Sequence, residues 1–408
     1  MTRGQEDKRR SVLLPSCPLV LLSSRHIRAG INASMTNQLI AILGAGQLGR
    51  MLALAGYPLG LRFRTLDPAA SSPAGQLAPQ IVAPFDDAAA LAQLAEGATC
   101  VTFEFENVPV ASARLLATHA PVYPPPAALE ASQDRLIEKR FFGSLGAATP
   151  PFAPIDTREE LTVALAAIGL PAVLKTRRMG YDGKGQCVIR TRVDADAAWT
   201  ALGGQPLILE GFVTFSRELS LIAVRGRDGA AAFYPLTENT HYAGILRRSI
   251  APAPDITPTL QSEAEQIAQR ALDALDYVGV LAIELFQTSD TLLVNEMAPR
   301  VHNSGHWTIE GAETSQFENH IRAIAGLPLG STAARGHSAM LNIIGVLPDV
   351  AALLRLPDAH LHLYGKTPRK GRKLGHLTVC ASDMSRLTEQ VTLAERWIDA
   401  TVRGTVFE

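Results

Sequence analysis

A short apolar segment that runs into a glycine-rich turn constrains the fold of this chain more than any other feature. Residues Leu39–Leu43 are continuously apolar, and the pattern Gly44-x-Gly46-x-x-Gly49 follows at once. A helix-like segment, Arg50–Gly56, comes next. A continuous apolar run is typical of a strand buried on both faces of a parallel sheet. The order of strand, tight turn and helix therefore predicts an open α/β sheet.

The sequence of the turn leaves its ligand open. Its spacing matches the dinucleotide fingerprint, and Asp67, about 20 residues after Gly46, stands where a ribose-binding acid would stand. Asp67 ends a second predicted strand, Leu61–Leu66, and a third is predicted at Cys100–Phe105. A helix N-terminus can also bind another phosphate, or the glycines can serve packing alone. A dinucleotide, another ligand and a purely structural turn all remain alternatives.

Composition narrows the class of protein. With 408 residues the chain has room for two or three domains, and 47% hydrophobic and 19% charged residues exclude disorder, collagen and coiled coil. A formal net charge of −1 argues against a general nucleic-acid coat. No stretch approaches the roughly 18 apolar residues of a membrane span. The four cysteines form no C-x-x-C pair, which predicts reduced thiols in a cytoplasmic enzyme.

The first 36 residues differ in pattern from the rest. They begin with basic residues, and their apolar run, 12–22, is broken by Pro15 and Pro18. A second methionine, Met35, stands just before the first predicted strand. We expect an extension that does not pack, with Met35 as the natural start. A targeting segment and an ordered arm are the alternatives.

Beyond Ala131 the pattern changes, after a proline cluster at 121–126 that predicts a boundary. Glu263–Asp276 carries its apolar residues on one stripe of a helix. Other predicted elements are the helix Asp134–Leu145 and the strands Ala172–Thr176, Leu207–Glu210, Glu218–Val224, Val280–Phe286 and Leu292–Met297. We divide the chain into an extension (1–36), an open α/β domain (37–130), a larger domain (131–330) and a small C-terminal domain (331–408).

A second glycine-rich loop, Gly180-Tyr181-Asp182-Gly183-Lys184-Gly185-Gln186, is a candidate phosphate site. Glycines let several backbone N–H groups converge on one anion, and Lys184 adds a positive charge. Lys175, Arg177 and Arg178 precede the loop with no nearby acid in the sequence. A flexible, solvated hairpin tip is the alternative, but it would leave these cations gathered without a counter-charge.

Two acidic residues, Glu284 and Glu296, lie on the two arms of the predicted hairpin, in a register that makes them direct partners. The same register pairs Thr288 with Leu292 and leaves a loop of about three residues. Carboxylates directly opposite each other repel, and a divalent cation between them removes the repulsion. Oxygen ligands favour Mg²⁺ with ATP phosphates completing its shell. Two solvated glutamates on an exposed face are the alternative.

Two polar segments follow the hairpin. Arg300–Trp307 is rich in hydrogen-bond donors, and we favour substrate contact over a zinc site because His302 and His306 have no apparent third ligand. The basic run Lys366–Lys373 contains no acid. Such a run is often only solvated, but the glycines around it favour a loop that wraps a phosphate.

Together these motifs resemble the ATP-grasp superfamily, and most closely the N5-carboxyaminoimidazole ribonucleotide synthetase family. The resemblance extends from about residue 38 to the C-terminus and implies a three-domain α/β and α+β fold. The implied fold has a Rossmann-like pre-ATP-grasp domain, an ATP-grasp domain and a small C-terminal domain that contributes to the ribonucleotide phosphate site. The matching stretches are Gly44–Met51, Thr102–Pro109, Gly180–Gln186, Phe233–Asn239, Asn295–Thr308 and Tyr364–Leu377.

The resemblance also implies roles for individual residues. Those expected to bind ATP are Arg135, Lys175, Gly180, Tyr181, Asp182, Gly183, Lys184, Gly185, Gln186, Glu210, Gly211, Phe212, Val213, Glu218, His241, Asn295 and Glu296. The expected Mg²⁺ ligands are Glu284 and Glu296. Those expected to bind the ribonucleotide substrate are Gln47, Leu48, Glu104, Glu106, Asn303, Ser304, Lys366, Arg372 and Lys373. The expected catalytic residues are Lys175, Asp182, Arg300 and His302.

The activity that the resemblance implies is ATP- and bicarbonate-dependent carboxylation of 5-aminoimidazole ribonucleotide through carboxyphosphate, in purine biosynthesis. It implies a cytoplasmic homodimer that uses ATP and Mg²⁺ and has neither a nucleic-acid nor a membrane partner. Asp182 and His302 are the candidates for proton handling. The alternatives are a formate-dependent ribonucleotide transformylase, a dinucleotide-dependent oxidoreductase that uses the first glycine turn, and a non-catalytic ATP-dependent scaffold.

Overall fold

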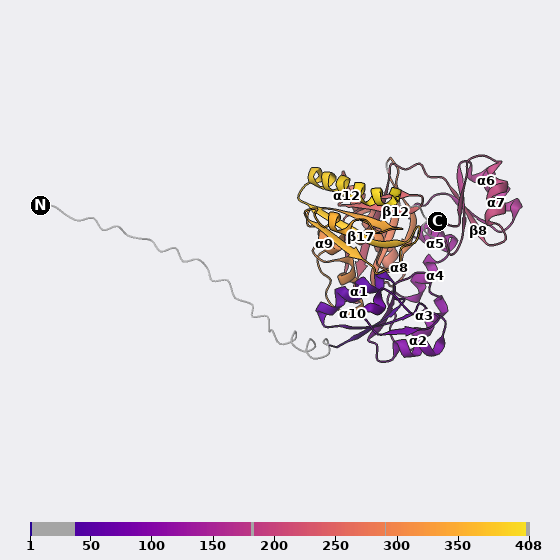
Figure 1. The fold of residues 1–408 in the computed structure, drawn as a ribbon. Coiled ribbons are helices and arrows are strands. Elements are labelled where there is room, and N and C mark those ends of the chain that lie inside the picture. Colours follow the sequence, from indigo (N-terminus) through magenta and orange to yellow (C-terminus); the bar gives the residue numbers. More distant parts are fainter. Residues whose placement is uncertain (2–36, 181–182, 290, 405–408) are drawn as a thin grey trace.

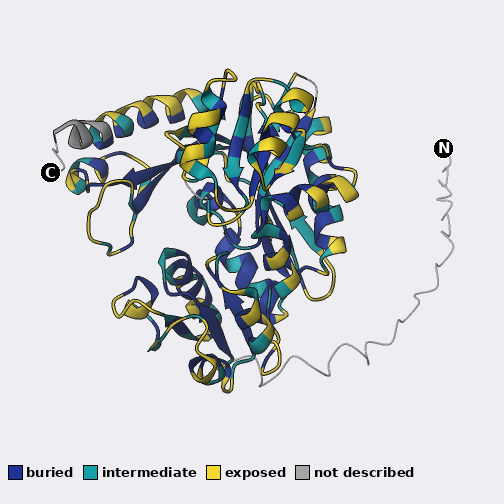
Figure 2. Ribbon diagram, turned by 90° about the vertical axis from the view of Figure 1, so that its right-hand side faces the viewer, coloured by how far each residue is buried: buried dark blue, intermediate teal, exposed yellow. Residues whose placement is uncertain are grey.

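The computed structural model describes residues 1, 37–180, 183–289 and 291–404, with side chains of the last helix described as far as Ile398. The expected N-terminal extension lies outside the described residues. The described chain forms three sheets with helices around them (Figure 1). Strands are largely buried, whereas the covering helices expose one side to solvent (Figure 2). Within the described segments, no helix has the length and apolar character needed to cross a membrane.

The first sheet is parallel, in the order β3-β2-β1-β4, as the alternating pattern predicts. The predicted strand Leu39–Leu43 is confirmed, and the predicted third strand ends earlier, at Phe103, where the chain turns toward the site. The elements of this part are β1 (Leu39–Leu43), α1 (Gln47–Gly56), η1 (Tyr57–Leu59), β2 (Arg62–Asp67), η2 (Ala74–Gln76), β3 (Gln80–Val82), α2 (Ala88–Ala95), β4 (Cys100–Phe103) and α3 (Val110–Leu116).

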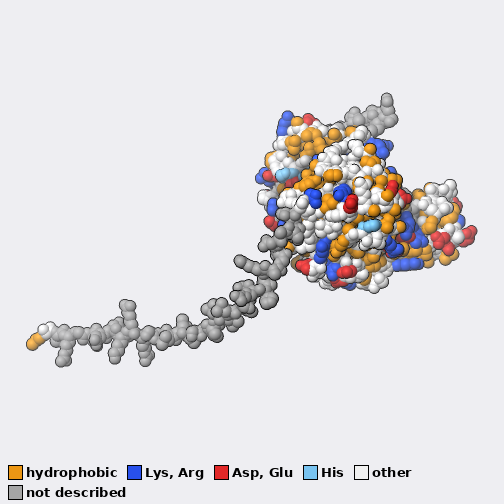
Figure 3. All heavy atoms as spheres, turned by 90° about the horizontal axis from the view of Figure 1, so that it is seen from below, with side chains coloured by type: hydrophobic (Ala, Val, Ile, Leu, Met, Phe, Trp, Pro, Cys, Tyr) orange, Lys and Arg blue, Asp and Glu red, His pale blue; other side chains and the backbone are white. Residues whose placement is uncertain are grey.

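The second sheet is antiparallel, in the order β5-β8-β6-β7, and forms a projecting lobe with α6 and α7 (Figure 1). Figure 3 shows hydrophobic, basic and acidic side chains intermixed on the lower face of the body beside this lobe. The elements here are α4 (Pro126–Ser132), α5 (Arg135–Ser144), β5 (Phe152–Ile155), α6 (Arg158–Ile168), β6 (Ala172–Thr176), β7 (Gln186–Ile189), α7 (Asp194–Leu202) and β8 (Leu207–Gly211).

The third sheet has the order β14-β13-β9-β11-β12-β15-β17-β16, with β10 paired to β9. The C-terminal strands therefore continue the sheet of the central region. The strands are β9 (Arg217–Arg225), β10 (Ala231–Phe233), β11 (Thr237–Tyr242), β12 (Ile245–Ala251), β13 (Gly279–Gln287), β14 (Leu292–Ala298), β15 (His337–Ile344), β16 (Ala359–Leu363) and β17 (Lys373–Ala381). The helices are α8 (Pro258–Ala274), η3 (Asn303–Gly305), α9 (Thr308–Gly311), α10 (Gln316–Ala325), α11 (Val350–Leu353) and α12 (Met384–Gly404).

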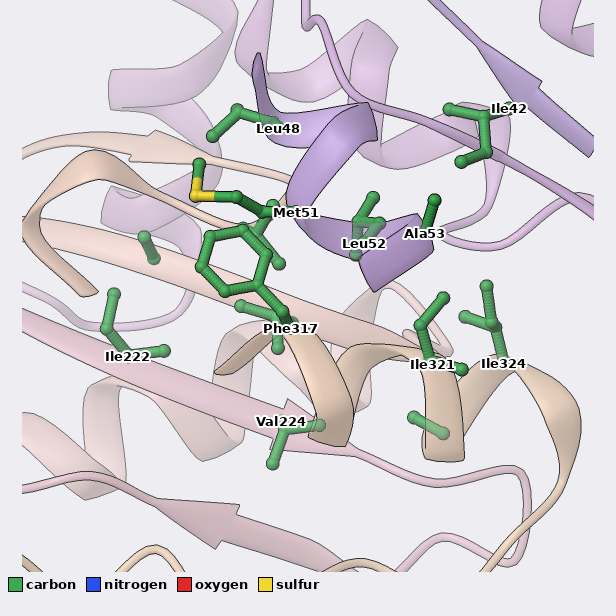
Figure 4. Packing of buried hydrophobic residues seen from close by; sticks show 14 of the residues in the cluster. Ile42, Leu48, Met51, Leu52, Ala53, Ile222, Val224, Phe317, Ile321 and Ile324 are labelled. Carbon is green, nitrogen blue, oxygen red and sulfur yellow. The ribbon is translucent and has the colours of Figure 1, made fainter. Parts of the chain in front are cut away.

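One apolar core joins the first sheet to the third. Figure 4 shows Met51 and Leu52 of α1 lying near Phe317 and Ile321 of α10, with β9 below them. His320 reinforces this junction, because its Nδ1 accepts a hydrogen bond from the backbone N–H of Val280 at 3.1 Å and its Nε2 lies 2.9 Å from the hydroxyl of Thr102. The packing fixes the carboxyl end of β1 relative to β13.

Candidate functional site

A cavity of about 1060 Å³ lies between the glycine turn after β1, the β6–β7 hairpin, the β13–β14 hairpin and the segment before β17. Strands of the second and third sheets line it, together with the segments that follow β1 and β4 of the first sheet. Every described residue that the sequence predicts for the site lines this cavity, apart from Gly185 and Ser304. The fold thus brings together residues that lie up to about 330 positions apart in the chain.

Glu284 on β13 and Glu296 on β14 are direct cross-strand partners, as the sequence predicts. Burial and the neighbouring charge of Glu296 raise the pKa of Glu284 to about 7. Opposed carboxylates repel each other, so the pair is suited to hold a cation. The described segments contain no group of three or more His, Cys, Asp and Glu side chains placed to hold a metal ion by themselves.

The predicted register holds from Ala282 to Glu284 but is wrong from Leu285 to the hairpin loop. Gln287, rather than Thr288, is the partner of Leu292, because a β-bulge at Asn295 shifts the register by one residue. In a regular strand consecutive side chains point to opposite faces. The extra residue of the bulge lets Asn295 and Glu296, which are consecutive, both line the cavity.

A network of charges crosses the floor of the cavity. Arg135 of α5 donates a hydrogen bond to Glu296 Oε2 at 2.7 Å. Lys175 of β6 donates to Glu210 Oε2 at 2.9 Å, and Lys139 Nζ lies 3.7 Å from the same oxygen. Burial disfavours the Glu210 carboxylate, but the charges of Lys175 and Lys139 outweigh this effect and lower the pKa of Glu210 to about 2. Glu210 therefore stays ionised at neutral pH.

The second glycine-rich loop joins β6 to β7. The loop residues that line the cavity are Gly180, Gly183, Lys184 and Gln186. The predictions for Tyr181 and Asp182 fall outside the described residues. Gly185, with φ of +71°, packs against Thr176, whose hydroxyl would lie 2.6 Å from an added Cβ. Gly185 therefore shapes the backbone of the loop.

The basic residues before this loop have a counter-charge, contrary to expectation. Asp134 accepts hydrogen bonds from Arg177 Nε at 3.0 Å and Nη2 at 2.7 Å, and from Arg178 Nε at 3.3 Å. The same carboxylate caps α5 by accepting from the backbone N–H of Leu136 at 3.0 Å. The two arginines thus anchor the stem of the loop to α5 and do not line the cavity.

The far end of the cavity combines apolar walls with a polar pair. Four consecutive residues expected to bind ATP line it: Glu210, Gly211, Phe212 and Val213. Phe215 and Phe286 stack beside them with ring centroids 4.8 Å apart. His241 is hydrogen-bonded to Glu218. Burial disfavours the imidazolium, but the hydrogen bond to Glu218 and the charge of Glu284 outweigh this effect and raise the pKa of His241.

The first glycine turn encloses a carboxylate of the chain itself. Glu104 accepts hydrogen bonds from the backbone N–H of Gly46 at 2.5 Å and of Gly49 at 2.8 Å. A Cβ on Gly46 would lie 2.5 Å from Glu104 Oε1, so glycine is required there. Asp67 accepts a hydrogen bond from the backbone N–H of Ala45 at 3.0 Å. Both acids are occupied within the protein, which argues against the dinucleotide alternative.

Residues expected to bind the ribonucleotide form the cavity wall next to the first glycine turn. Arg300 donates a hydrogen bond to Glu106. Burial opposes ionisation of Glu106, but Arg300 outweighs this effect and lowers the pKa of Glu106 below its usual value. Lys366 is hydrogen-bonded to Gln47, next to Leu48 on the cavity wall. Gln47 begins α1, and Lys366 follows β16. Their contact therefore closes the cavity between an N-terminal helix and a C-terminal loop.

The loop after β14 arranges His302 by hydrogen bonds. The backbone N–H of Ser304 donates to His302 Nδ1 at 3.3 Å, so the ring proton resides on Nε2, which lies 3.4 Å from Glu284 Oε1. Burial and the charge of Arg300 lower the pKa of His302 well below its usual value. Ser304 is fully buried, with its hydroxyl 2.8 Å from that of Ser220. Ser304 therefore supports the wall and does not form its surface.

Neighbouring residues complete this wall. The amide groups of Asn303 and Asn342 exchange hydrogen bonds at 3.0 and 2.6 Å, which fixes Asn303 at the cavity. The basic residues of the segment before β17 also line it: Lys366, Arg369, Lys370, Arg372 and Lys373. This cluster of positive charge suits a phosphate group.

Three family models match consecutive parts of the chain. They are the ribonucleotide synthetase preATP-grasp domain at residues 37–133, the ATP-grasp domain at 140–317 and the phosphoribosylaminoimidazole carboxylase C-terminal domain at 338–390. The N5-carboxyaminoimidazole ribonucleotide synthase of Pseudomonas aeruginosa is 53% identical over 361 residues, covering 88% of this chain and 99% of that protein. The chain belongs to the N5-carboxyaminoimidazole ribonucleotide synthase family.

Solved structures of N5-carboxyaminoimidazole ribonucleotide synthases have the same fold. The Thermus thermophilus enzyme matches with a TM-score of 0.85 and 59% identity, covering 88% of this chain and 98% of that chain. The Aspergillus clavatus enzyme, solved with ADP and 5-aminoimidazole ribonucleotide, matches with a TM-score of 0.83 and 32% identity, covering 90% and 100%. The predicted family and the ATP-grasp fold are confirmed, and the chain is an ATP-grasp ligase.

Sequence reasoning missed several residues at this synthase site. Glu138 and Lys139 lie under the cavity on α5, and Phe215 and Phe286 wall its far end. Lys139 has a detectable signal, because it falls on the apolar face of α5 with Leu136, where a charge calls for an explanation. The phenylalanines have no such signal, since apolar residues are common in strands and loops.

Proposed function

We propose that this family member carboxylates the exocyclic amine of 5-aminoimidazole ribonucleotide, using ATP and bicarbonate and releasing ADP and phosphate, in purine biosynthesis. The observation that carries the proposal is a single cavity lined by both the predicted ATP residues and the predicted ribonucleotide residues. Within this cavity Glu296 contacts Arg135, and Glu284 lies 3.4 Å from His302. This arrangement supports a reaction in which an activated carboxyl donor lies beside the amine that receives it.

The carboxylate pair fits Mg²⁺. Mg²⁺ is usually held by one or two carboxylates, with phosphates and water completing its shell, and the described residues offer two opposed glutamates and no closed protein cage. Arg135 pairs with Glu296, whereas burial and the charge of Glu296 raise the pKa of Glu284. Glu284 and Glu296 would hold the ion, with Asn295 beside them. When bound, Mg²⁺ would neutralise phosphate charge.

Phosphoryl transfer would activate the bicarbonate. A bicarbonate oxygen attacks the γ-phosphorus of ATP and the bond to the β-phosphate oxygen breaks, giving carboxyphosphate and ADP. The transferring group spreads negative charge over its oxygens. Lys175 and Arg300 line the cavity with their charges already fixed by Glu210 and Glu106. Such pre-positioned cations stabilise the transition state without further reorganisation.

Carboxylation of the amine follows, with loss of phosphate and one proton. The hydrogen bonds to His302 leave its proton on Nε2, facing Glu284. This supports a role for His302 as a hydrogen-bond donor at the reacting groups more than as a base. Asp182, the other candidate for proton handling, lies outside the described residues.

The ribonucleotide would lie against the glycine turn and the basic segment. Gln47 and Leu48 line one side of the cavity, and Lys366, Arg372 and Lys373 line another. We assign the 5′-phosphate to the three basic residues because carboxylates occupy the N–H groups of the turn. Glu104 and Glu106 lie nearby as contacts for the aminoimidazole.

The proposal extends to a homodimer in the cytoplasm and to the three domains given above, as the family leads us to expect. Light scattering on the purified protein tests the dimer, and a mass of one chain would contradict it. Limited proteolysis tests the domain boundaries: cleavage near 330, between α10 and β15, should be preferred over cleavage inside a sheet, whereas position 130 lies within α4.

Production of ADP tests the reaction. We expect ADP release only when 5-aminoimidazole ribonucleotide, bicarbonate and Mg²⁺ are all present, and at least a 100-fold loss in Glu296→Gln. Glu313→Gln is a suitable control, because Glu313 is exposed and does not line the cavity. Full activity in Glu296→Gln would remove the metal assignment. Formate-dependent turnover would favour a transformylase, and the absence of any amine-dependent turnover would favour an ATP-dependent scaffold.

A further inference from the structure

We propose that Glu138 and Lys139 of α5 are positioning residues, which hold the β-bulge at Asn295 and thereby keep Glu296 directed into the cavity. The inference rests on the proposed function, since it concerns a residue that would hold Mg²⁺. Neither Glu138 nor Lys139 lines the cavity. Both contact the backbone of β14, and Lys139 also lies 3.7 Å from Glu210.

The bulge creates polar backbone groups that the sheet does not satisfy. The extra residue of a bulge lies outside the ladder of hydrogen bonds, and a buried carbonyl without a donor is costly. Lys139 Nζ donates to the carbonyl of Asn295 at 2.5 Å and to that of Val294 at 3.3 Å. The Lys139 side chain is 1% exposed. A buried ammonium requires such partners, so the bulge and this lysine depend on each other.

Glu138 holds the other side of the bulge. Its carboxylate accepts a hydrogen bond from the backbone N–H of Met297 at 2.6 Å, immediately after Glu296. One turn earlier on the same helix, Arg135 pairs with the Glu296 side chain at 2.7 Å. One face of α5 therefore holds Glu296 by its side chain and by the backbone on both sides.

The register shows what the bulge achieves. Gln287 pairs with Leu292, and continuing that register without a bulge would pair Glu284 with Asn295. Side chains alternate between faces along a strand, so Glu296 would then point away from Glu284. The two carboxylates face each other because the bulge is present, and α5 supplies the hydrogen bonds that stabilise it.

Binding of Mn²⁺ in the presence of ADP tests this role without relying on turnover. In Lys139→Met, which keeps the apolar stem and removes the donors, we expect at least a 10-fold weaker Mn²⁺ affinity, by titration calorimetry or electron paramagnetic resonance. Lys139→Arg should recover part of the loss. Arg140→Met, at the next and exposed position of α5, should bind as the wild type does.

The Glu138 variants give an independent measurement. Glu138→Gln keeps an oxygen acceptor and should lose less than 3-fold in Mn²⁺ affinity, whereas Glu138→Leu should lose at least 10-fold. A crystal structure of Lys139→Met with both Asn295 and Glu296 still in the cavity, or unchanged Mn²⁺ affinity in Lys139→Met and Glu138→Leu, would overturn the inference. Failure of the wild-type protein to bind Mn²⁺ with ADP would instead overturn the proposed metal site, and the inference with it.

Discussion

The carboxylate of Glu104 lies at the N-terminus of α1, where it accepts a hydrogen bond from the backbone N–H of Gly49 at 2.8 Å. That position is where a helix N-terminus binds the phosphate of a ligand in many α/β proteins. Here an acid from the end of β4 supplies the negative charge. The turn keeps its glycines because Glu104 needs close approach, and its neighbours Gln47 and Leu48 are left facing the cavity.

Replacing Glu104 should destabilise the protein. Glu104→Gln substitutes an amide for one of the two acceptor oxygens that face N–H groups, and we expect a loss of about 1–3 kcal/mol in the free energy of unfolding. Denaturant unfolding measures it. Glu130→Gln is the control, since Glu130 forms an exposed ion pair with Arg114 and should cost less than about 1 kcal/mol. Equal effects in the two variants would contradict this account of the turn.

The hydrogen bonds between Glu104 and the glycine turn also predict which nucleotides the protein binds. Because Glu104 and Asp67 already accept hydrogen bonds from the N–H groups of the turn, NADH and NADPH should not bind there. Calorimetry should show binding of ATP with Mg²⁺ and no saturable heat with either dinucleotide. Tight dinucleotide binding that survives removal of ATP would restore the oxidoreductase alternative.

Asp134 should contribute more to stability than an ordinary helix cap. It caps α5 and also accepts hydrogen bonds from Arg177, so Asp134→Ala removes charge-assisted bonds as well as the cap. We expect a loss of about 2–4 kcal/mol in the free energy of unfolding. Asp87→Ala is matched to it, because Asp87 caps α2 with bonds to backbone N–H groups alone, and should cost about 1 kcal/mol. Thermal unfolding of both variants separates the contribution of the helix cap from that of the bonds to Arg177.

His320 should make the protein less stable in acid. Burial lowers its pKa to about 3, whereas the unfolded chain has a pKa near 6.5. Above pH 6.5 the ring is neutral in both states and has no effect on the pH dependence. As the pH falls from about 6.5 toward 3, the unfolded state binds the proton first, so stability decreases by up to about 1.4 kcal/mol per pH unit.

Urea unfolding at pH 7.5 and pH 5.0 measures this effect. His320→Gln, which keeps a polar side chain between Thr102 and Val280, should show a smaller difference between the two pH values than the wild type does. His119→Gln is the control, because His119 is exposed and should leave the pH difference unchanged. An unchanged difference in His320→Gln would show that other groups govern acid stability.

Local sequence patterns determined much of this protein. The apolar run Leu39–Leu43 and its glycine turn predicted the first parallel strand and helix, because burial on both faces of a sheet requires continuous apolar residues. The carboxylates Glu284 and Glu296 were predicted as partners from their spacing alone. Motifs that are tied to one chemistry, such as Arg300–Trp307, predicted the family that the comparisons confirm.

Tertiary structure decided what depends on distant contacts. The bulge at Asn295 has no signal in the hairpin sequence, because the donor that stabilises it, Lys139, comes from another helix. Asp134 pairs with Arg177 across about 40 residues of chain, so this counter-charge has no local signal in the sequence. The sequence could place a carboxylate on a strand, but only packing between elements determines which acid is satisfied within the protein and which one faces the cavity.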